Sequence, residues 1–120
     1  MKEQRILVIE DEFLIAMEIA SALEEAGFSG VEIADNEAQA LHRIATEHWD
    51  GVVADANLNG QRINRVVVTV CERSIPFIIV TGYGKRALPA SIGDAPVVEK
   101  PFDGPTLAAA LNRVLNTRTV

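Results

Sequence analysis

Five polar side chains stand where short apolar runs of this sequence end. Glu10 and Asp11 follow the first such run, and Asp55, Thr81 and Lys100 stand at the ends of three later ones. Carboxylates about 5 Å apart repel by roughly 3 kcal/mol per pair at an effective dielectric constant of about 20, so three acids brought together need a cation. Ligands that are all oxygen suit Mg²⁺, with Mn²⁺ as the alternative.

The apolar runs alternate with segments of helical period. The fold that these strands and helices form must therefore position the polar side chains. The alternation predicts an α/β fold whose parallel sheet is covered by helices on both faces. In such a sheet, ligands bind at the carboxyl ends of the strands. The predicted strands are 5–10, 31–34, 51–55, 77–80 and 96–98, and the predicted helices are 13–27, 37–48, 65–71 and 102–115.

The segment RVVVTVC, residues 65–71, is rich in β-branched residues, which by propensity favour a strand. However, the crossover between the parallel strands on either side of it is normally helical. We therefore predict a helix of low intrinsic stability. Its apolar side chains fall on one helical face, with the cysteine as a buried thiol: Val66, Val67, Val70 and Cys71.

Composition limits the class of protein. The 120 residues, 48% of them apolar, predict a single domain over 1–120. A net charge of −6 argues against nucleic-acid binding, which needs clustered Lys and Arg. One cysteine forms no internal disulfide, which favours a reducing cytoplasm. No apolar stretch is long enough to span a membrane, and the acids at 10–12 interrupt the N-terminal apolar run too early for a signal peptide.

Four features of the sequence each stand at the end of a predicted strand. In chain order they are an acidic pair at 10–11, Asp55, Thr81 with Gly82, and a Lys-Pro at 100–101. Over the whole chain this pattern resembles the receiver domains of bacterial two-component response regulators. The resemblance implies a doubly wound five-stranded parallel sheet with the flavodoxin-like order 2-1-3-4-5. Only eighteen residues, several of them Gly or Pro, separate Thr81 from the lysine, so we expect a short or irregular fourth helix.

The resemblance assigns the acids their roles. It implies that Asp55 is the phosphoacceptor and that Asp11 and Asp55 bind Mg²⁺ directly. Glu10, which replaces the more usual Asp, would bind the metal directly or through water, and the backbone carbonyl of Asn57 would complete the protein ligands. An oxygen of Asp55 would then attack phosphorus in line while the metal offsets the charge of the phosphoryl group.

The remaining site residues would bind the phosphoryl group. By the same resemblance, Lys100 neutralises a phosphoryl oxygen and Thr81 donates a hydroxyl hydrogen bond to it. The backbone amides of Ala56 and Gly82 are expected as further donors. The bond before Pro101 is expected to be cis, a geometry that only an X-Pro bond adopts at low cost.

A narrower resemblance links three stretches to the FAT GUY subgroup of response regulators, which are often stand-alone receivers: DANLNG (55–60), PFIIVTGYG (76–84) and VVEKPF (97–102). One departure concerns the output. Val97 stands where receivers usually carry an aromatic residue whose rotamer reports phosphorylation. We therefore hypothesise that Tyr83, close to Thr81, carries the signal instead.

These features predict a receiver that accepts a phosphoryl group from a sensor histidine kinase or a histidine phosphotransfer protein and acts by protein contact. It would not be an enzyme, beyond self-phosphorylation and slow autodephosphorylation. The alternative is a pseudoreceiver that binds proteins without phosphorylation. A phosphohydrolase ranks last, because Asn57 stands where a general acid would be needed. Leu14 and Met17, beside the core stripe of the first helix, are expected to help dock the phosphodonor. No oligomeric state is predicted.

Overall fold

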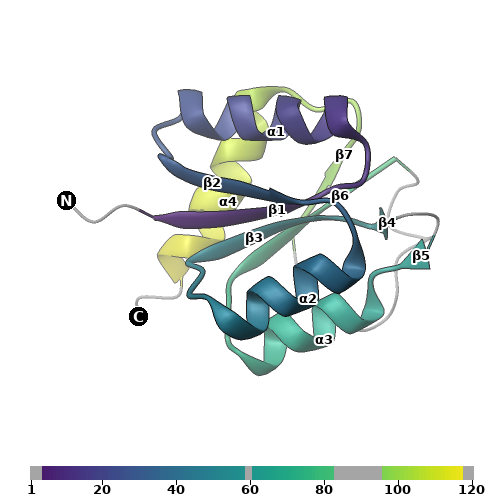
Figure 1. Cartoon of the computed structure of the whole chain (residues 1–120). Helices are drawn as coiled ribbons and strands as arrows, with labels where there is room; N and C mark the ends of the chain where they lie inside the picture. Colours follow the sequence, from purple (N-terminus) through teal and green to yellow (C-terminus); the bar gives the residue numbers. More distant parts are fainter. Residues whose placement is uncertain (1–3, 59–60, 83–95, 118–120) are drawn as a thin grey trace.

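Five parallel strands form the central sheet of this protein. The computed structural model describes residues 4–58, 61–82 and 96–117. The strand order is β2-β1-β3-β6-β7, which is the predicted flavodoxin-like order (Figure 1). Parallel pairing brings the carboxyl ends of the strands to one edge of the sheet. The strands are β1 (Arg5–Ile9), β2 (Gly30–Ala34), β3 (Gly51–Asp55), β6 (Phe77–Thr81) and β7 (Val97–Glu99).

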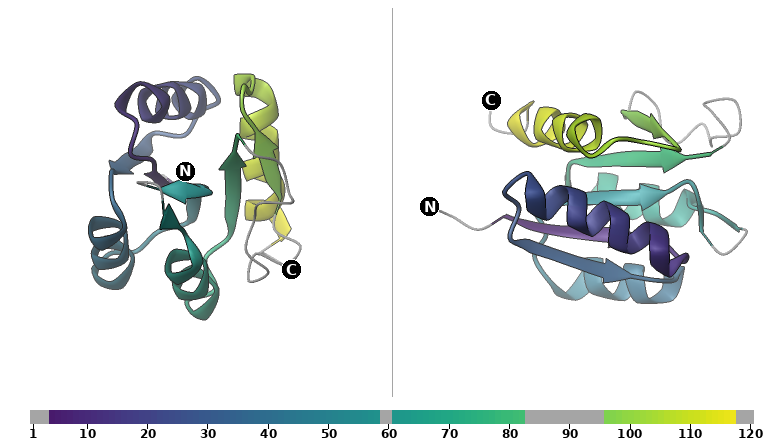
Figure 2. Two further views of the ribbon diagram at one scale, coloured as in Figure 1. Left: turned by 90° about the vertical axis from the view of Figure 1, so that its right-hand side faces the viewer. Right: turned by 90° about the horizontal axis from the view of Figure 1, so that it is seen from above.

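Helices cover both faces of the sheet (Figure 2). One face carries α1 (Phe13–Glu25) and α4 (Gly104–Thr117), and the other carries α2 (Glu37–Thr46) and α3 (Asn64–Glu72). This arrangement confirms the doubly wound α/β fold that the alternation of strands and helices predicts. In the described part of the chain, no helix combines the length and apolar character needed to cross a membrane.

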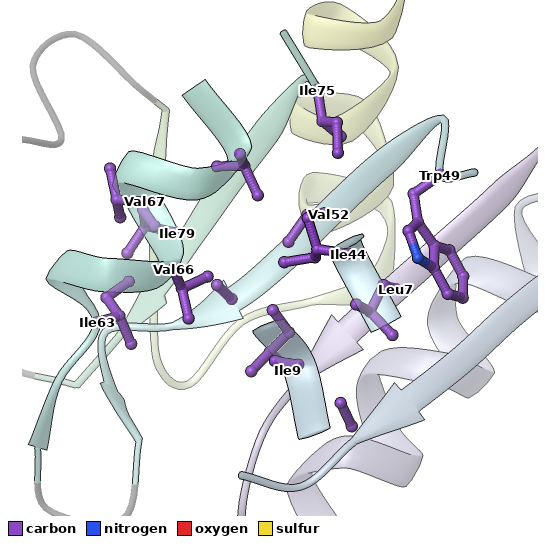
Figure 3. Packing of buried hydrophobic residues seen from close by; sticks show 14 of the residues in the cluster. Leu7, Ile9, Ile44, Trp49, Val52, Ile63, Val66, Val67, Ile75 and Ile79 are labelled. Atoms are coloured by element: carbon purple, nitrogen blue, oxygen red, sulfur yellow. The ribbon is translucent and has the colours of Figure 1, made fainter. Parts of the chain in front are cut away.

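The sheet separates two apolar cores. In β1, Ile6 and Val8 pack toward α1 and α4, whereas Leu7 and Ile9 pack toward α2 and α3. All four side chains are 0% exposed, which explains why this strand is a continuous apolar run and not an alternating one. Figure 3 shows the core beneath α2 and α3, where the large ring of Trp49 closes one end.

The segment rich in β-branched residues is helical, as its place in the topology predicts. In α3, Val66, Val67 and Val70 are each 1% exposed and join the core shown in Figure 3. Cys71, however, is exposed, so the prediction of a buried thiol was wrong. The physical reason is the helical turn of about 100° per residue, which carries Cys71 away from the sheet although its neighbour Val70 faces it.

Two short strands beyond β3 were not predicted from the sequence. The strands β4 (Asn57–Leu58) and β5 (Gln61–Arg62) pair antiparallel beyond the carboxyl end of β3 (Figure 1). Strands of two residues are too short to produce a detectable alternation of apolar and polar residues. The expected fourth helix falls mainly in residues 83–95, which lie outside the described residues.

A polar cluster ties the strands together at the opposite edge of the sheet. The guanidinium carbons of Arg5 and Arg43 lie 4.2 and 5.1 Å from the ring centroid of Trp49. Both guanidinium groups also form ion pairs with Glu32 and Glu47. Because these residues come from β1, β2 and the α2 region, the cluster joins the edge strand β2 and its neighbour β1 to the helix that covers them.

Candidate functional site

Two neighbouring strands bring three acids together at the carboxyl edge of the sheet. Glu10 and Asp11 follow β1, and Asp55 ends β3, the strand that pairs directly with β1. One carboxylate oxygen from each of the three acids lies within 4.8 Å of the others. The acidic cluster expected from the sequence is therefore present in the structure.

The next strands add a hydroxyl and an ammonium. Thr81 ends β6 and is 0% exposed, and its carbonyl oxygen accepts a hydrogen bond of 2.8 Å from the amide of Lys100. The Nζ of Lys100 donates to Oε1 of Glu10 at 3.2 Å and lies 3.6 Å from Oδ1 of Asp55. The bond between Lys100 and Pro101 is cis, in agreement with expectation. The fold thus gathers residues that are up to 90 positions apart in the chain.

Glu10 is the most buried of the three acids, at 1% exposed. Its Oε2 accepts a hydrogen bond from the amide of Glu12 at 3.2 Å, and its Oε1 accepts one from Lys100. Burial first, and then the neighbouring Asp55 carboxyl, raises the pKa of Glu10 from 4.5 to about 7 against the opposite effects of Glu12 and Lys100. Burial lowers the pKa of Lys100, but the charges of Asp55 and Glu10 outweigh burial and raise it. Lys100 therefore keeps its positive charge, and the described carboxylates around it outnumber that charge.

The donor set fits a Mg²⁺ ion. Carboxylate oxygens are the ligands this ion prefers, and two ligands on opposite sides of it lie about 4.2 Å apart. Neighbouring ligands of an octahedral Mg²⁺ lie about 3 Å apart, so the three oxygens, which lie within 4.8 Å of one another, reach such an arrangement with small side-chain movements. Among the described residues, three carboxylates face the ammonium of Lys100 in this cluster, and a divalent cation would offset the remaining negative charge. Glu10, Asp11 and Asp55 are thus the residues able to hold the metal.

Three backbone groups are expected at the site, and their surroundings in the structure differ. Asn57 begins β4, two residues after Asp55. The amide of Ala56 donates to the carbonyl of Val80 at 2.9 Å, so it would have to leave that bond to reach a phosphoryl oxygen. A Cβ added at Gly82 would meet no atom within 4 Å, so open space adjoins this residue, as its expected role requires.

Three candidate residues remain: Tyr83, Leu14 and Met17. Tyr83 falls outside the described residues. Leu14 and Met17 lie on α1, where they are 77% and 43% exposed. Phe13, 72% exposed, adjoins them and was missed by the sequence analysis. Its signal was available, because Phe13 begins the helix at a position off the stripe of residues that the analysis placed in the core.

The fold and the site together define a class of protein. A doubly wound parallel sheet carries an acidic pair, a strand-end aspartate, a buried threonine and a lysine before a cis proline at its carboxyl edge. In sheets of this kind the ligand site lies where the strand order reverses, here between β1 and β3. The sequence model of the response regulator receiver domain matches residues 6–112. The chain belongs to that family.

Individual relatives agree with this assignment. The transcriptional activator protein IrlR of Burkholderia pseudomallei (strain 1026b) is 33% identical over 119 residues, which cover 92% of this chain and 50% of IrlR. The phyllosphere-induced regulator PhyR of Methylorubrum extorquens is 27% identical, over 92% of this chain and 43% of PhyR. The chain thus spans about half the length of these curated relatives or slightly less.

Solved structures resemble the chain over almost its whole length. A response regulator receiver protein from Sinorhizobium medicae is 25% identical, with a TM-score of 0.87 and 98% coverage of both chains. The response regulator PhyR from Brucella abortus is 31% identical, with a TM-score of 0.83, and the match covers 98% of this chain and 50% of that protein.

Proposed function

We propose that this protein is a phospho-accepting receiver in which Asp55 takes a phosphoryl group in a Mg²⁺-dependent reaction. The donor would be a sensor histidine kinase or a histidine phosphotransfer protein, and the output would be a change in protein contacts. The observation that carries the proposal is the position of Lys100, whose Nζ lies beside both Glu10 and Asp55 in a cluster of three carboxylates. A structural ion pair would not need the third acid, Asp11.

The proposed transfer breaks one bond and forms one. An oxygen of Asp55 attacks phosphorus in line as the bond between phosphorus and the donor's imidazole nitrogen breaks. The electron pair of the broken bond stays on that nitrogen, and the acyl phosphate forms on Asp55. When bound, Mg²⁺ offsets the charge of the phosphoryl oxygens and so lowers the repulsion that the attacking carboxylate meets.

Each neighbouring residue has a proposed part in this reaction. Lys100 turns its ammonium from Glu10 to a phosphoryl oxygen, a movement that its position between the two carboxylates makes short. Thr81 donates its hydroxyl from the end of β6, and the amide of Gly82 donates beside it. Asp11 and Asp55 would bind the metal directly. Glu10 would contact the metal directly or through water, since its Oε1 is released when Lys100 turns away while its Oε2 still accepts from the Glu12 amide.

Other parts of the proposal concern the surroundings of the reaction. The carbonyl of Asn57 is a proposed metal ligand, and Tyr83 is the proposed aromatic residue that reports phosphorylation in place of Val97. Leu14 and Met17 are proposed to contact the phosphodonor. The cytoplasm remains our proposed compartment, since a chain with one cysteine builds no internal disulfide.

Intact-protein mass after incubation with acetyl phosphate tests the proposal. We expect one added phosphoryl group that requires both Mg²⁺ and Asp55 and is therefore absent from Asp55→Asn. Asp35→Asn is the matched control, because Asp35 is an exposed acid at the same edge of the sheet, just after β2. A chain that binds no Mg²⁺ and gains no phosphoryl group would instead be a pseudoreceiver, a module that binds proteins without this chemistry.

A further inference from the structure

The carboxylate of Glu10 connects two parts of the molecule that lie far apart in the chain. Its Oε1 accepts a hydrogen bond from the Nζ of Lys100 at 3.2 Å, and its Oε2 accepts one from the amide of Glu12, also at 3.2 Å. Lys100 follows β7, whereas Glu12 precedes α1, which begins beside the carboxyl end of β1 (Figure 1). Glu10 is 1% exposed, so little water competes for either bond. One buried carboxylate therefore joins the end of β7 to the start of α1.

The start of α1 depends on this carboxylate. Glu12 is the N-cap residue of α1, but its own side chain makes no capping hydrogen bond, and the first turn of this fully described helix contains no acidic residue. A negative charge near a helix N-terminus stabilises the helix, because the unpaired backbone amides there carry partial positive charge. Glu10 supplies such a charge from a buried position, through the amide of Glu12. A change in how the Glu10 carboxylate is shared therefore affects the first turn of α1.

The side chain of Lys100 is the part of this connection that can move. Its backbone is held in place, because its amide donates to the carbonyl of Thr81 at 2.8 Å. Its Nζ lies between the two carboxylates, 3.6 Å from Oδ1 of Asp55. A phosphoryl group on Asp55 carries up to about two negative charges, more than the carboxylate of Glu10, so it draws the ammonium away from Glu10. Rotation of the lysine side chain is enough for this movement, and it leaves Glu10 without its cation.

We infer that Glu10 is a positioning residue that transmits the phosphorylation state of Asp55 to the first turn of α1. The inference deepens the proposed function and rests on it for the phosphoryl group. When Lys100 turns to that group, the carboxylate of Glu10 is no longer shared with the ammonium, and its hydrogen bond to the amide of Glu12 changes. The adjoining turn of α1 carries Phe13, which is 72% exposed. A protein in contact with Phe13 would therefore distinguish the two states of Asp55.

Removing the ammonium in the absence of any phosphoryl group tests this coupling. Lys100→Met leaves Glu10 without its cation, and two-dimensional NMR in EDTA compares the amide signals of the variant with those of the native chain. We expect the signals of Glu12 and Phe13 to shift. Arg113→Met, which removes an exposed cation from α4, is the matched control and should leave both signals in place. No phosphorylation takes part, so a failure of the proposed function would leave this comparison intact.

The same substitution in a Glu10→Gln background decides whether Glu10 carries the effect. Glutamine keeps an oxygen for the amide of Glu12 but lacks the charge that Lys100 shares, so adding Lys100→Met should no longer shift the Glu12 signal. A shift that persists in the double variant would show that the ammonium acts on α1 without Glu10, and would overturn the inference. An unchanged Glu12 signal would do the same, either in Lys100→Met or in a native chain whose phosphoryl adduct is confirmed by mass. The comparison of the native chain before and after phosphorylation stands even if a variant fails to fold.

Discussion

Lys100 and Glu10 form an ion pair of 3.2 Å across the carboxyl edge of the sheet, and Lys100 also lies 3.6 Å from Asp55. The side chain of Glu10 is one methylene longer than that of the Asp usual in this family, and it places its carboxylate where it accepts from both Lys100 and the Glu12 amide. The ammonium of Lys100 is therefore shared between two acids before any phosphoryl group arrives.

Replacing Lys100 with Met should slow phosphoryl uptake while strengthening metal binding. The phosphoryl group loses a charged donor, which we expect to lower the rate by about 100-fold. Mg²⁺, in contrast, no longer competes with an ammonium for the same carboxylates. Uptake rates from acetyl phosphate and calorimetric titration with Mg²⁺ measure the two effects. Arg113→Met, on the exposed side of α4, is the control, and a parallel loss of both properties would contradict this role for Lys100.

The raised pKa of Glu10 predicts how stability depends on pH without metal. The folded pKa is about 7 and the ordinary value is 4.5, so the folded chain holds a proton that the unfolded chain has released. The contribution to stability is complete below pH 4.5 and is lost as the pH rises through 7, by an amount of about 3 kcal/mol at most. Urea unfolding in EDTA between pH 5 and 8 measures this loss.

The variant Glu10→Gln should flatten that pH dependence, because it has no proton to release. Adding Mg²⁺ at pH 8 should restore stability to the native chain more than to the variant, since the cation replaces the lost proton as the source of positive charge. A native chain whose stability rises between pH 5 and 8 in EDTA would contradict the placement of Glu10 in a buried, metal-free cluster.

The ion pairs around Trp49 predict that stability falls as the pH is lowered, which is the opposite of the dependence predicted for Glu10. Hydrogen bonds from Arg43, and then from Arg5, lower the pKa of Glu47 from 4.5 to about 2. The stability that Glu47 provides is therefore complete above pH 4.5 and is lost as the pH falls through 2. Trp49 is the single tryptophan, so its fluorescence reports unfolding. Glu47→Gln should be less stable than the native chain at pH 7, and the difference should shrink below pH 4.5. A constant difference would count against these ion pairs.

The exposed position of Val68 in α3 predicts that Val68→Ala stabilises the protein. It is 46% exposed and sits in a helix rich in β-branched residues, so Val68→Ala loses little buried area and improves helix propensity by about 0.5 kcal/mol. The neighbouring Val67→Ala should destabilise by about 2 kcal/mol, because Val67 is 1% exposed. Thermal unfolding of the pair measures both effects, and a loss of stability in Val68→Ala would show that the exposed valine packs against something.

The α/β fold was predictable because apolar runs and segments of helical period alternate along almost all of the described chain. Once β1, β3 and β6 are parallel neighbours, an order that the family resemblance implied, Glu10, Asp55 and Thr81 must meet at one edge. The helix at 64–72 was predicted against its propensity, because parallel strands on either side leave few other connections.

Features that depend on side-chain reach or on single turns were not predictable. The ion pair between Glu10 and Lys100 follows from the length of two flexible side chains, which residue spacing does not specify. The exposure of Cys71 depends on one step of about 100° around α3. The close approach of Gly104 at the start of α4 to Ala22 in α1 is a tertiary contact between distant parts of the chain.

The most direct test of the central claim is to locate the phosphoryl group on the chain. Borohydride reduces an aspartyl phosphate to homoserine, so peptide mass mapping after treatment with acetyl phosphate, Mg²⁺ and then borohydride identifies the modified residue. Our account predicts homoserine at position 55, none when EDTA replaces Mg²⁺, and none at Asp11 or Asp35. Homoserine at any other aspartate, or equal modification of Asp55 in EDTA, would contradict it.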